Sequence, residues 1–145
     1  MEKKRIKRYK EKLEQIEEFL NYLKDWTKDI NKNDFIYKLN IREQLSIYHA
    51  YQIIIEAISD LAAMIIKDLN LIPKDDYTNI NLLVKKQIIS KEISLVIKEA
   101  TGLRNKIVHK YNRIVDEIAY KGILSHINGL EKYKEVVKKW YQKNF

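Results

Sequence analysis

Apolar residues recur every three or four positions over most of the chain, which is the spacing of one face of an α-helix. Residues 3–28 show this spacing, and the polar segment 29–34 ends it. A long apolar-rich segment follows from 35 to 69, with an interruption expected near Asn40. Its density of apolar residues predicts a central, mostly buried helix.

The clearest predicted loop spans residues 70–77, because Pro73 disfavours helix at the residue before it and two aspartates offer local turn bonds. Asn79 is then expected to cap a short helix that ends near Gln87. The pattern therefore predicts a loop and a short helix after the central one.

Ser90 starts the next predicted helix, which reaches about Lys110, and a last one is predicted for residues 116–141. About five helices joined by short loops predict an all-α, antiparallel helical bundle. With no repeat or low-complexity linker, residues 1–145 are expected to form a single domain. The helix that starts at Ser90 is expected to pack on the long central helix.

The composition narrows the chemistry, because the chain contains no cysteine. This excludes a disulfide framework, a thiolate metal site and a cysteine nucleophile, and no metal site or cofactor is predicted. No apolar leader follows the charged start, and the most apolar run, 53–66, is interrupted by Glu56, Ser59 and Asp60. We therefore expect a cytoplasmic protein that does not span a membrane.

The formal net charge of +8 predicts attraction of polyanions, among which nucleic acid is the obvious candidate. Much of the excess lies near the two ends of the chain, where charged residues often only solvate a helix face. These residues are Lys3, Lys4, Arg5, Lys7, Arg8, Lys132, Lys134, Lys138, Lys139 and Lys143. Nucleic-acid binding and simple solvation both remain open.

The helix after Ser90 ends in the stretch "RNKIVHKY", residues 104–111. Its apolar residues fall in one arc roughly 140° wide, and Arg104 lies in the middle of that arc. The arc contains Ile89, Ile93, Val96, Ile97, Ala100, Leu103, Ile107 and Val108. A charged group there needs a carboxylate, a phosphate or an oligomer interface, and Glu56 and Asp60 of the central helix are the nearest plausible carboxylates.

His109 lies on another side of the helix, in line with Gly102 and Asn105. These small or polar residues form a strip where a backbone or a ligand could approach closely. A surface position is the alternative for this histidine, and it is also expected for His49 and His126, which have no motif around them.

Arg104 and His109 together offer the chemistry of RNA cleavage. A histidine titrates near neutrality, an arginine can hold a phosphate bidentately, and RNA supplies its own nucleophile in the 2′-hydroxyl. However, residues five apart on a straight helix point about 140° away from each other. Either the helix loosens near His109, or a second chain completes the site.

Three stretches, "AYQIIIEAISDLAAMIIKDLNL", "LIPKDDY" and "ATGLRNKIVHKYNRIVDEIAY", resemble the HEPN superfamily in order and spacing. Within it, the chain is similar to the HepT-like proteins of prokaryotic toxin–antitoxin pairs. Their motif is an arginine, four to six residues and a histidine, with an asparagine after the arginine and a tyrosine two residues beyond the histidine. Arg104, Asn105, His109 and Tyr111 match it.

The resemblance implies a metal-independent endoribonuclease that forms a homodimer and cleaves RNA in a cleft between two protomers. In that case Arg104 and His109 are the catalytic pair, and Asn105 accompanies them. Glu56 and Asp60 match acidic positions of the family and are expected to support the site. Such a dimer would also explain why the two catalytic side chains diverge on one helix.

The resemblance also implies a partner, a minimal (MNT-type) nucleotidyltransferase antitoxin that silences the toxin by AMPylation of the motif tyrosine, here Tyr111. Each AMP adds negative charge and bulk beside the cleft, which would repel and block RNA. Lys110 stands where some relatives have glycine. Two alternatives remain: a noncatalytic HEPN subunit that binds a nucleotide or a nucleotidyltransferase, and a plain basic nucleic-acid-binding bundle.

Overall fold

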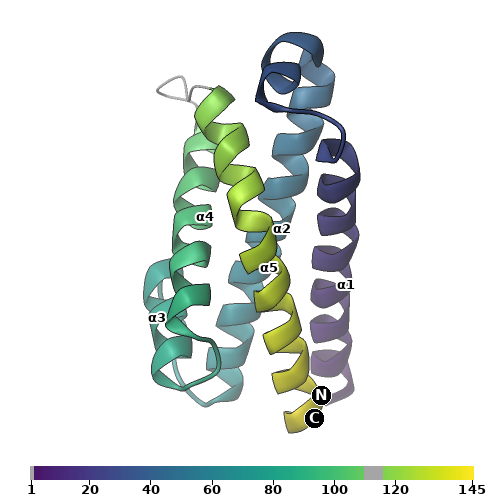
Figure 1. Ribbon diagram of the computed structural model, residues 1–145. Coiled ribbons are helices and arrows are strands. Elements are labelled where there is room, and N and C mark those ends of the chain that lie inside the picture. The colour runs from purple at the N-terminus through teal and green to yellow at the C-terminus, as the bar shows by residue number, and fades with distance from the viewer. Residues whose placement is uncertain (1, 110–115) are drawn as a thin grey trace.

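The computed structural model describes residues 2–109 and 116–145, and within these ranges it contains helices and no strand (Figure 1). The predicted all-α fold is confirmed. Five α-helices and one short π-helical segment follow one another along the chain: α1 (Glu2–Thr27), η1 (Asp34–Lys38), α2 (Ile41–Asp68), α3 (Asp76–Lys85), α4 (Lys91–His109) and α5 (Asp116–Asn144).

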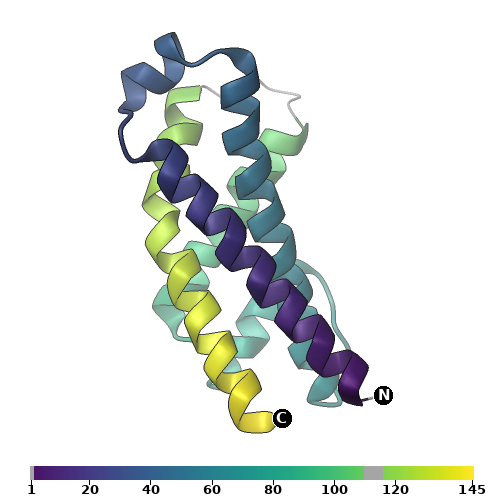
Figure 2. The same ribbon diagram turned by 90° about the vertical axis from the view of Figure 1, so that its right-hand side faces the viewer.

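The four long helices run up and down along a common axis, and the short α3 lies beside the lower part of α4 (Figures 1 and 2). Helix α1 packs against α2 and α5, and α4 packs against α5 and α2. Both chain ends lie at the lower end of the bundle, whereas α4 ends and α5 begins at the upper end. The predicted antiparallel arrangement, with α4 against α2, is therefore confirmed.

Helix α2 forms the centre of the core, and the expected interruption before it is present. Asn40 begins α2 with a reciprocal capping box, in which its side chain accepts a hydrogen bond from the backbone of Glu43 and the Glu43 side chain accepts one from Asn40. By length and composition alone this helix could cross a membrane. However, 56% of its most apolar window is buried inside the bundle, as expected for a core helix.

The start of α3 differs from the prediction, because Asn79 does not cap it. Asp75 is the capping residue, and its side chain accepts a hydrogen bond from the Thr78 backbone at 3.3 Å. Asn79 is buried one turn further on, where its side chain bonds both the backbone nitrogen and the carbonyl of Lys74, at 2.7 and 3.0 Å. The asparagine thus fixes the loop onto the helix instead of starting the helix.

Helices α4 and α5 approach each other closely at glycines of α5. A Cβ atom at Gly129 would lie 2.4 Å from a methyl carbon of Val96, and one at Gly122 would lie 2.6 Å from a methyl carbon of Leu103. Both distances are far shorter than ordinary van der Waals contact. At Gly129 the Cβ would also lie 2.8 Å from Val96 Cβ, so this position requires glycine at the present helix separation, whereas at Gly122 the flexible end of Leu103 could move.

A buried lysine joins α1 to α5. The Lys134 side chain is only 8% exposed, and its ammonium lies 3.0 Å from Glu131, 3.5 Å from Glu135 and 3.9 Å from Glu17 of α1. Glu131 also pairs with Lys24 of α1. Burial alone would lower the pKa of Lys134, but the surrounding glutamates raise it above its ordinary value, so the lysine stays charged.

We expect Gly129→Ala to lower the free energy of unfolding by about 1–3 kcal/mol, the usual cost of overpacking, although alanine favours helix over glycine by up to about 1 kcal/mol. The added methyl group would collide with Val96. Urea denaturation of Gly129→Ala, Val96→Ala and the double variant measures this. The double variant should cost less than the sum of the singles, and a stabilised Gly129→Ala would contradict the close packing.

Candidate active site

Arg104 lies in the last two turns of α4, with its guanidinium between two other helices. Its Nη1 atom is 4.0 Å from Glu56 Oε1 of α2, and its Nη2 atom is 3.9 Å from Asp76 Oδ2 of α3. The side chain is 18% exposed. Its Nε atom is buried and has no hydrogen-bond partner among the described residues. Both carboxylates therefore attract the guanidinium, yet neither is close enough for a good hydrogen bond.

Helix α4 presents Arg104 in this way because its apolar positions hold the helix against the core. Ser90 caps it as predicted, accepting a hydrogen bond from the Ile93 backbone at 3.1 Å. Most of the predicted apolar arc is buried, including Leu103 beside Arg104. The prediction is wrong for Val108, which is 41% exposed. Val108 lies at the edge of the arc, whereas Ile107, near its middle, stays buried at 5% exposure.

Only one of the two carboxylates expected beside Arg104 lies there. Glu56 is present, and Gln52 donates a hydrogen bond to it at 3.1 Å. Asp60, one turn further along α2, instead accepts a hydrogen bond from Lys12 of α1 at 2.7 Å. The second carboxylate is Asp76, from the first turn of α3. The expectation that Asp60 lies beside Arg104 is therefore wrong, because Asp60 forms an ion pair with Lys12 at the surface. Asp76 is the second carboxylate near Arg104.

The strip predicted along α4 is partly occupied by α3. A Cβ atom at Gly102 would lie 3.3 Å from the hydroxyl of Tyr77, so the glycine leaves room for this tyrosine. Asn105, about one turn further on, is partly exposed. The N-terminal turn of α3 thus contributes two side chains to this region, Asp76 toward Arg104 and Tyr77 toward Gly102.

The other motif residues lie at the edge of the described structure. His109 is the last residue of α4, at the upper end of the bundle, and its side chain is outside the described residues. Tyr111 is also outside them. The predicted catalytic role of His109 and the predicted modification of Tyr111 therefore stay predictions.

Sequence comparison assigns most of the chain to a known family. Residues 9–137 match the family described as Ribonuclease HepT-like. The chain belongs to the HepT-like ribonuclease family. The recognition made from the motif and its flanking helices is confirmed, as is the prediction that the chain is a ribonuclease.

Two archaeal relatives agree with the family assignment. A protein of Methanocaldococcus jannaschii named as a candidate RNase is 40% identical over 75 residues, which cover 51% of this chain and 86% of the relative. A protein of Archaeoglobus fulgidus with the same kind of name is 31% identical over 140 residues, covering 96% of this chain and 92% of the relative.

Solved structures share the fold of this HepT-like chain. A tri-AMPylated HEPN toxin of Shewanella oneidensis, in complex with an MNT antitoxin, has a TM-score of 0.80 at 23% identity and covers 91% of this chain and 97% of its own. A cytosolic protein of unknown function from Bacillus subtilis has a TM-score of 0.75 at 15% identity and covers 94% and 92%. At these identities the likeness concerns the fold.

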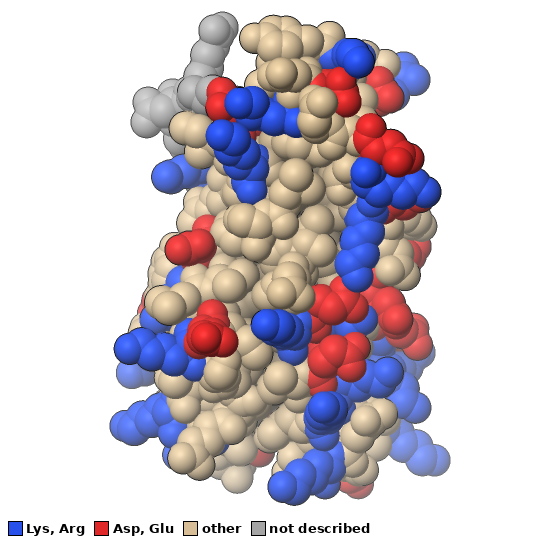
Figure 3. All heavy atoms as spheres, in the orientation of Figure 1, with Lys and Arg blue, Asp and Glu red and all other residues tan. Residues whose placement is uncertain are grey.

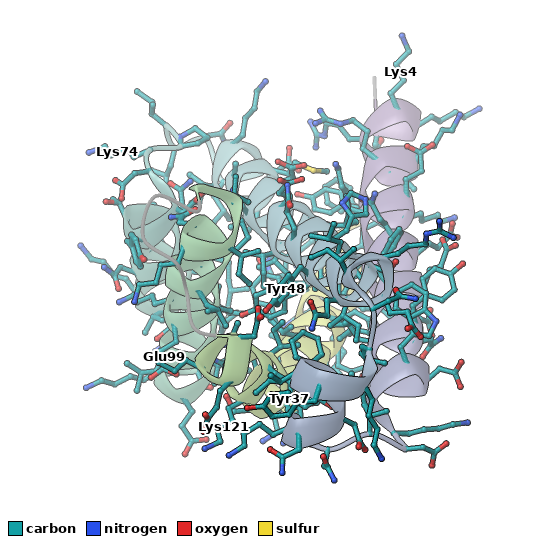
Figure 4. The ribbon with its side chains drawn as sticks, turned by 90° about the horizontal axis from the view of Figure 1, so that it is seen from above. Lys4, Tyr37, Tyr48, Lys74, Glu99 and Lys121 are labelled. Carbon is teal, nitrogen blue, oxygen red and sulfur yellow. The ribbon has the colours of Figure 1, made fainter. Side chains whose placement is uncertain are left out.

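This HepT-like chain also contains a buried histidine that sequence reasoning missed. His126 of α5, expected at the surface, is only 5% exposed. Its Nδ1 atom lies 2.6 Å from the Tyr51 hydroxyl of α2, and its Nε2 atom lies 3.4 Å from the carboxylate of Glu99, on the outside of α4 (Figure 4). With the proton on Nε2, the ring accepts from Tyr51 and donates toward Glu99, so neutral His126 connects three helices.

The surroundings of His126 favour its neutral form. Burial lowers its pKa from the ordinary value of 6.5, and the interaction with Glu99 opposes this only in part. Its spacing along α5 was the available signal, because Ile123 and Leu130, three residues before and four after, are both buried.

We expect His126 to make the fold sensitive to mild acid. Because burial lowers its pKa, the unfolded chain takes up a proton at a higher pH than the native chain, so the free energy of unfolding falls as the pH drops below about 6.5. In His126→Gln this fall should be smaller, by at most about 1.4 kcal/mol per pH unit, the slope that one proton gives.

Urea denaturation between pH 7.5 and 5 measures this slope. The matched control is His49→Gln, because His49 is exposed on α2, and it should retain the slope of the unsubstituted protein. Equal slopes in the His126→Gln and His49→Gln variants would contradict the assignment.

Proposed function

We propose that the chain is a metal-independent endoribonuclease toxin of a prokaryotic toxin–antitoxin pair, which cleaves RNA with Arg104 and His109 in a cleft between two protomers. The observation that carries the proposal is the state of the Arg104 guanidinium. It is held between Glu56 and Asp76 at 4.0 and 3.9 Å, and its buried Nε has no partner among the described residues.

This arrangement suits a side chain that receives an anion. An arginine stays ionised when buried, and it normally uses its donors in short, often bidentate hydrogen bonds. Here the two carboxylates orient the guanidinium while leaving donors for a phosphate group. We assign Glu56 and Asp76 this orienting role. The partial exposure of Arg104 leaves a path for the ligand.

The proposed reaction uses the 2′-hydroxyl of RNA as the nucleophile. A histidine accepts its proton, the 2′-oxygen forms a bond to the adjacent phosphorus, and the bond from phosphorus to the 5′-oxygen breaks. The departing oxygen takes up a proton, giving a 2′,3′-cyclic phosphate and a 5′-hydroxyl. Arg104 stabilises the charge on the phosphate, and Asn105 and Gly102 line the approach.

Two protomers are proposed because Arg104 and His109 diverge by about 140° on a straight helix. In a symmetric dimer, the histidine of one chain can act on a phosphate held by the arginine of the other. Two histidines would then be available, one as the base and one as the acid.

The proposed partner is an MNT-type nucleotidyltransferase antitoxin, because a similarly folded HEPN toxin is AMPylated and bound to an MNT antitoxin. We propose that the partner transfers AMP to Tyr111, two residues beyond His109. The added phosphate charge and nucleoside would exclude RNA from the same place. A cytoplasmic location follows from an RNA substrate and agrees with the cytosolic neighbour of this fold.

The alternative is a noncatalytic HEPN subunit that binds a nucleotide or the nucleotidyltransferase. The pairing of Arg104 with acidic residues of α2 and α3 is the observation that favours it, because ion pairs of this kind also serve purely as structural links between helices.

We expect Arg104→Ala and His109→Ala each to lower the rate of RNA cleavage by at least about 100-fold, since one removes the phosphate donors and the other the proton carrier. Cleavage of labelled RNA in excess EDTA, with mass analysis of the product ends, measures this. Lys106→Ala is the control, because Lys106 is an exposed cation of the same helix. It should stay active, and full activity in both site variants would exclude the proposed pair.

We expect incubation with the partner nucleotidyltransferase and ATP to raise the intact mass in AMP-sized steps and to stop RNA cleavage. Tyr111→Phe should stay unmodified and active, because it lacks the acceptor oxygen. Tyr37→Phe removes an exposed hydroxyl elsewhere and should still be modified. Modification of Tyr111→Phe to the same extent would place the acceptor on another residue.

A further inference from the structure

The positive charge of the chain is concentrated in its two end segments. Residues 2–10 and 132–145 together contain eleven lysines and arginines but only two glutamates. All the other residues together contain seventeen basic and eighteen acidic side chains. Without the end segments, the remainder is therefore close to neutral.

The fold brings these two segments together. At the lower end of the bundle the Tyr9 ring lies 5.5 Å from Tyr141, 5.6 Å from Phe145 and 6.1 Å from Trp140, measured between ring centroids. The Arg5 guanidinium lies 5.4 Å from the centre of the Phe145 ring. The start of α1 and the end of α5 therefore pack side by side, and their cations share one end of the molecule (Figures 1 and 2).

We call this surface the basic pole and define it by six exposed residues: Lys3, Lys4, Arg8, Lys138, Lys139 and Lys143. Lys4 projects outward from the first turns of α1 (Figure 4), and Figure 3 shows blue side chains among uncharged ones at the lower right, where α1 begins and α5 ends. Within the described chain, no salt bridge joins any of the six to a carboxylate. By contrast, Lys28, Lys38 and Lys121 each pair with a nearby acid of their own segment.

The pole also lacks the apolar side chains that a membrane surface would require. Large exposed apolar residues occur elsewhere on the described chain, but none lies in residues 2–10 or 132–145. The aromatic rings in these segments contact one another, and Trp140 and Phe145 are only partly exposed. A charged surface without apolar anchors suits the backbone of a nucleic acid better than a lipid bilayer.

We propose that the basic pole binds the phosphate backbone of long RNA substrates at a distance from the cleavage site. Helix α5 is 29 residues long and runs from the upper end, where α4 ends, to the pole. This length corresponds to about 43 Å, or about a dozen stacked nucleotides at roughly 3.4 Å each. RNA that reaches both places would bind more tightly than a short RNA that fills only the cleft. The cleavage part of this inference rests on the proposed function, whereas the binding part does not.

The binding test uses proteins carrying His109→Ala, so that RNA stays intact. A fluorescent 30-nucleotide RNA is titrated over a range of salt concentrations with two triple variants of equal charge. One removes half of the pole (Lys138→Gln, Lys139→Gln and Lys143→Gln), and the other removes three paired lysines (Lys28→Gln, Lys38→Gln and Lys121→Gln). All six positions are exposed, so both variants should fold.

The pole variant should lose about tenfold or more in affinity, and the slope of log affinity against log salt should become shallower by about 2, from about 0.7 per lost phosphate contact on single-stranded RNA. The paired-lysine variant should change much less. Equal losses in the two variants would reduce the effect to net charge and overturn the proposal. The proposal would also be overturned if the pole variant kept its RNA affinity but lost binding to phosphatidylserine vesicles.

The cleavage test uses the active protein with the 30-nucleotide RNA and a 6-nucleotide RNA. In the pole variant, KM for the long RNA should rise and kcat should stay the same. For the short RNA, both KM and kcat should stay the same. An equal change for both lengths would contradict a remote contact. If no RNA is cleaved but the pole variant still loses affinity for RNA, the proposed function is wrong and the proposal that the basic pole binds RNA is supported.

Discussion

The burial of α2 is the constraint on which the other features depend. Its inner residues pack against α1, α3 and α4, and side-chain hydrogen bonds from Tyr51 and Tyr133 join it to α5. Because the centre of α2 is filled by apolar side chains, its carboxylates can lie only along its edges. Glu56 and Asp60 occupy two such edge positions, toward α4 and toward α1. The helix packing therefore decides which acid meets the arginine of α4.

The same packing explains why Arg104 is incompletely satisfied. A buried donor without a partner costs about 1–3 kcal/mol, and Arg104 Nε is such a donor among the described residues. Glu56 is held by Gln52, and Asp76 is fixed in the first turn of α3. In these positions their oxygens lie 4.0 and 3.9 Å from the guanidinium nitrogens. Among the described residues the site therefore leaves the Arg104 Nε donor without a partner, as expected where a ligand completes the interactions.

Periodicity predicted the helices well, since it depends on residues near in sequence. It failed where the position or partner of a side chain depends on residues far away in the sequence. Asn79 has the residue type of a cap, but Asp75 lies earlier and takes that role. Nothing near Arg104 in the sequence points to Asp76, because only the turn of the chain before α3 brings it there. His126 was misjudged because its residue type outweighed its position on the buried face of α5.

The buried ammonium of Lys134 affects the stability of the bundle at raised temperature. At room temperature, removing a lysine and its glutamates from water costs nearly as much free energy as their attraction returns. The hydration of charged groups becomes less favourable on warming, so this cost decreases while the attraction among Lys134, Glu131, Glu135 and Glu17 remains. The link between α1 and α5 should therefore strengthen, relative to the apolar core, at temperatures where many proteins begin to melt.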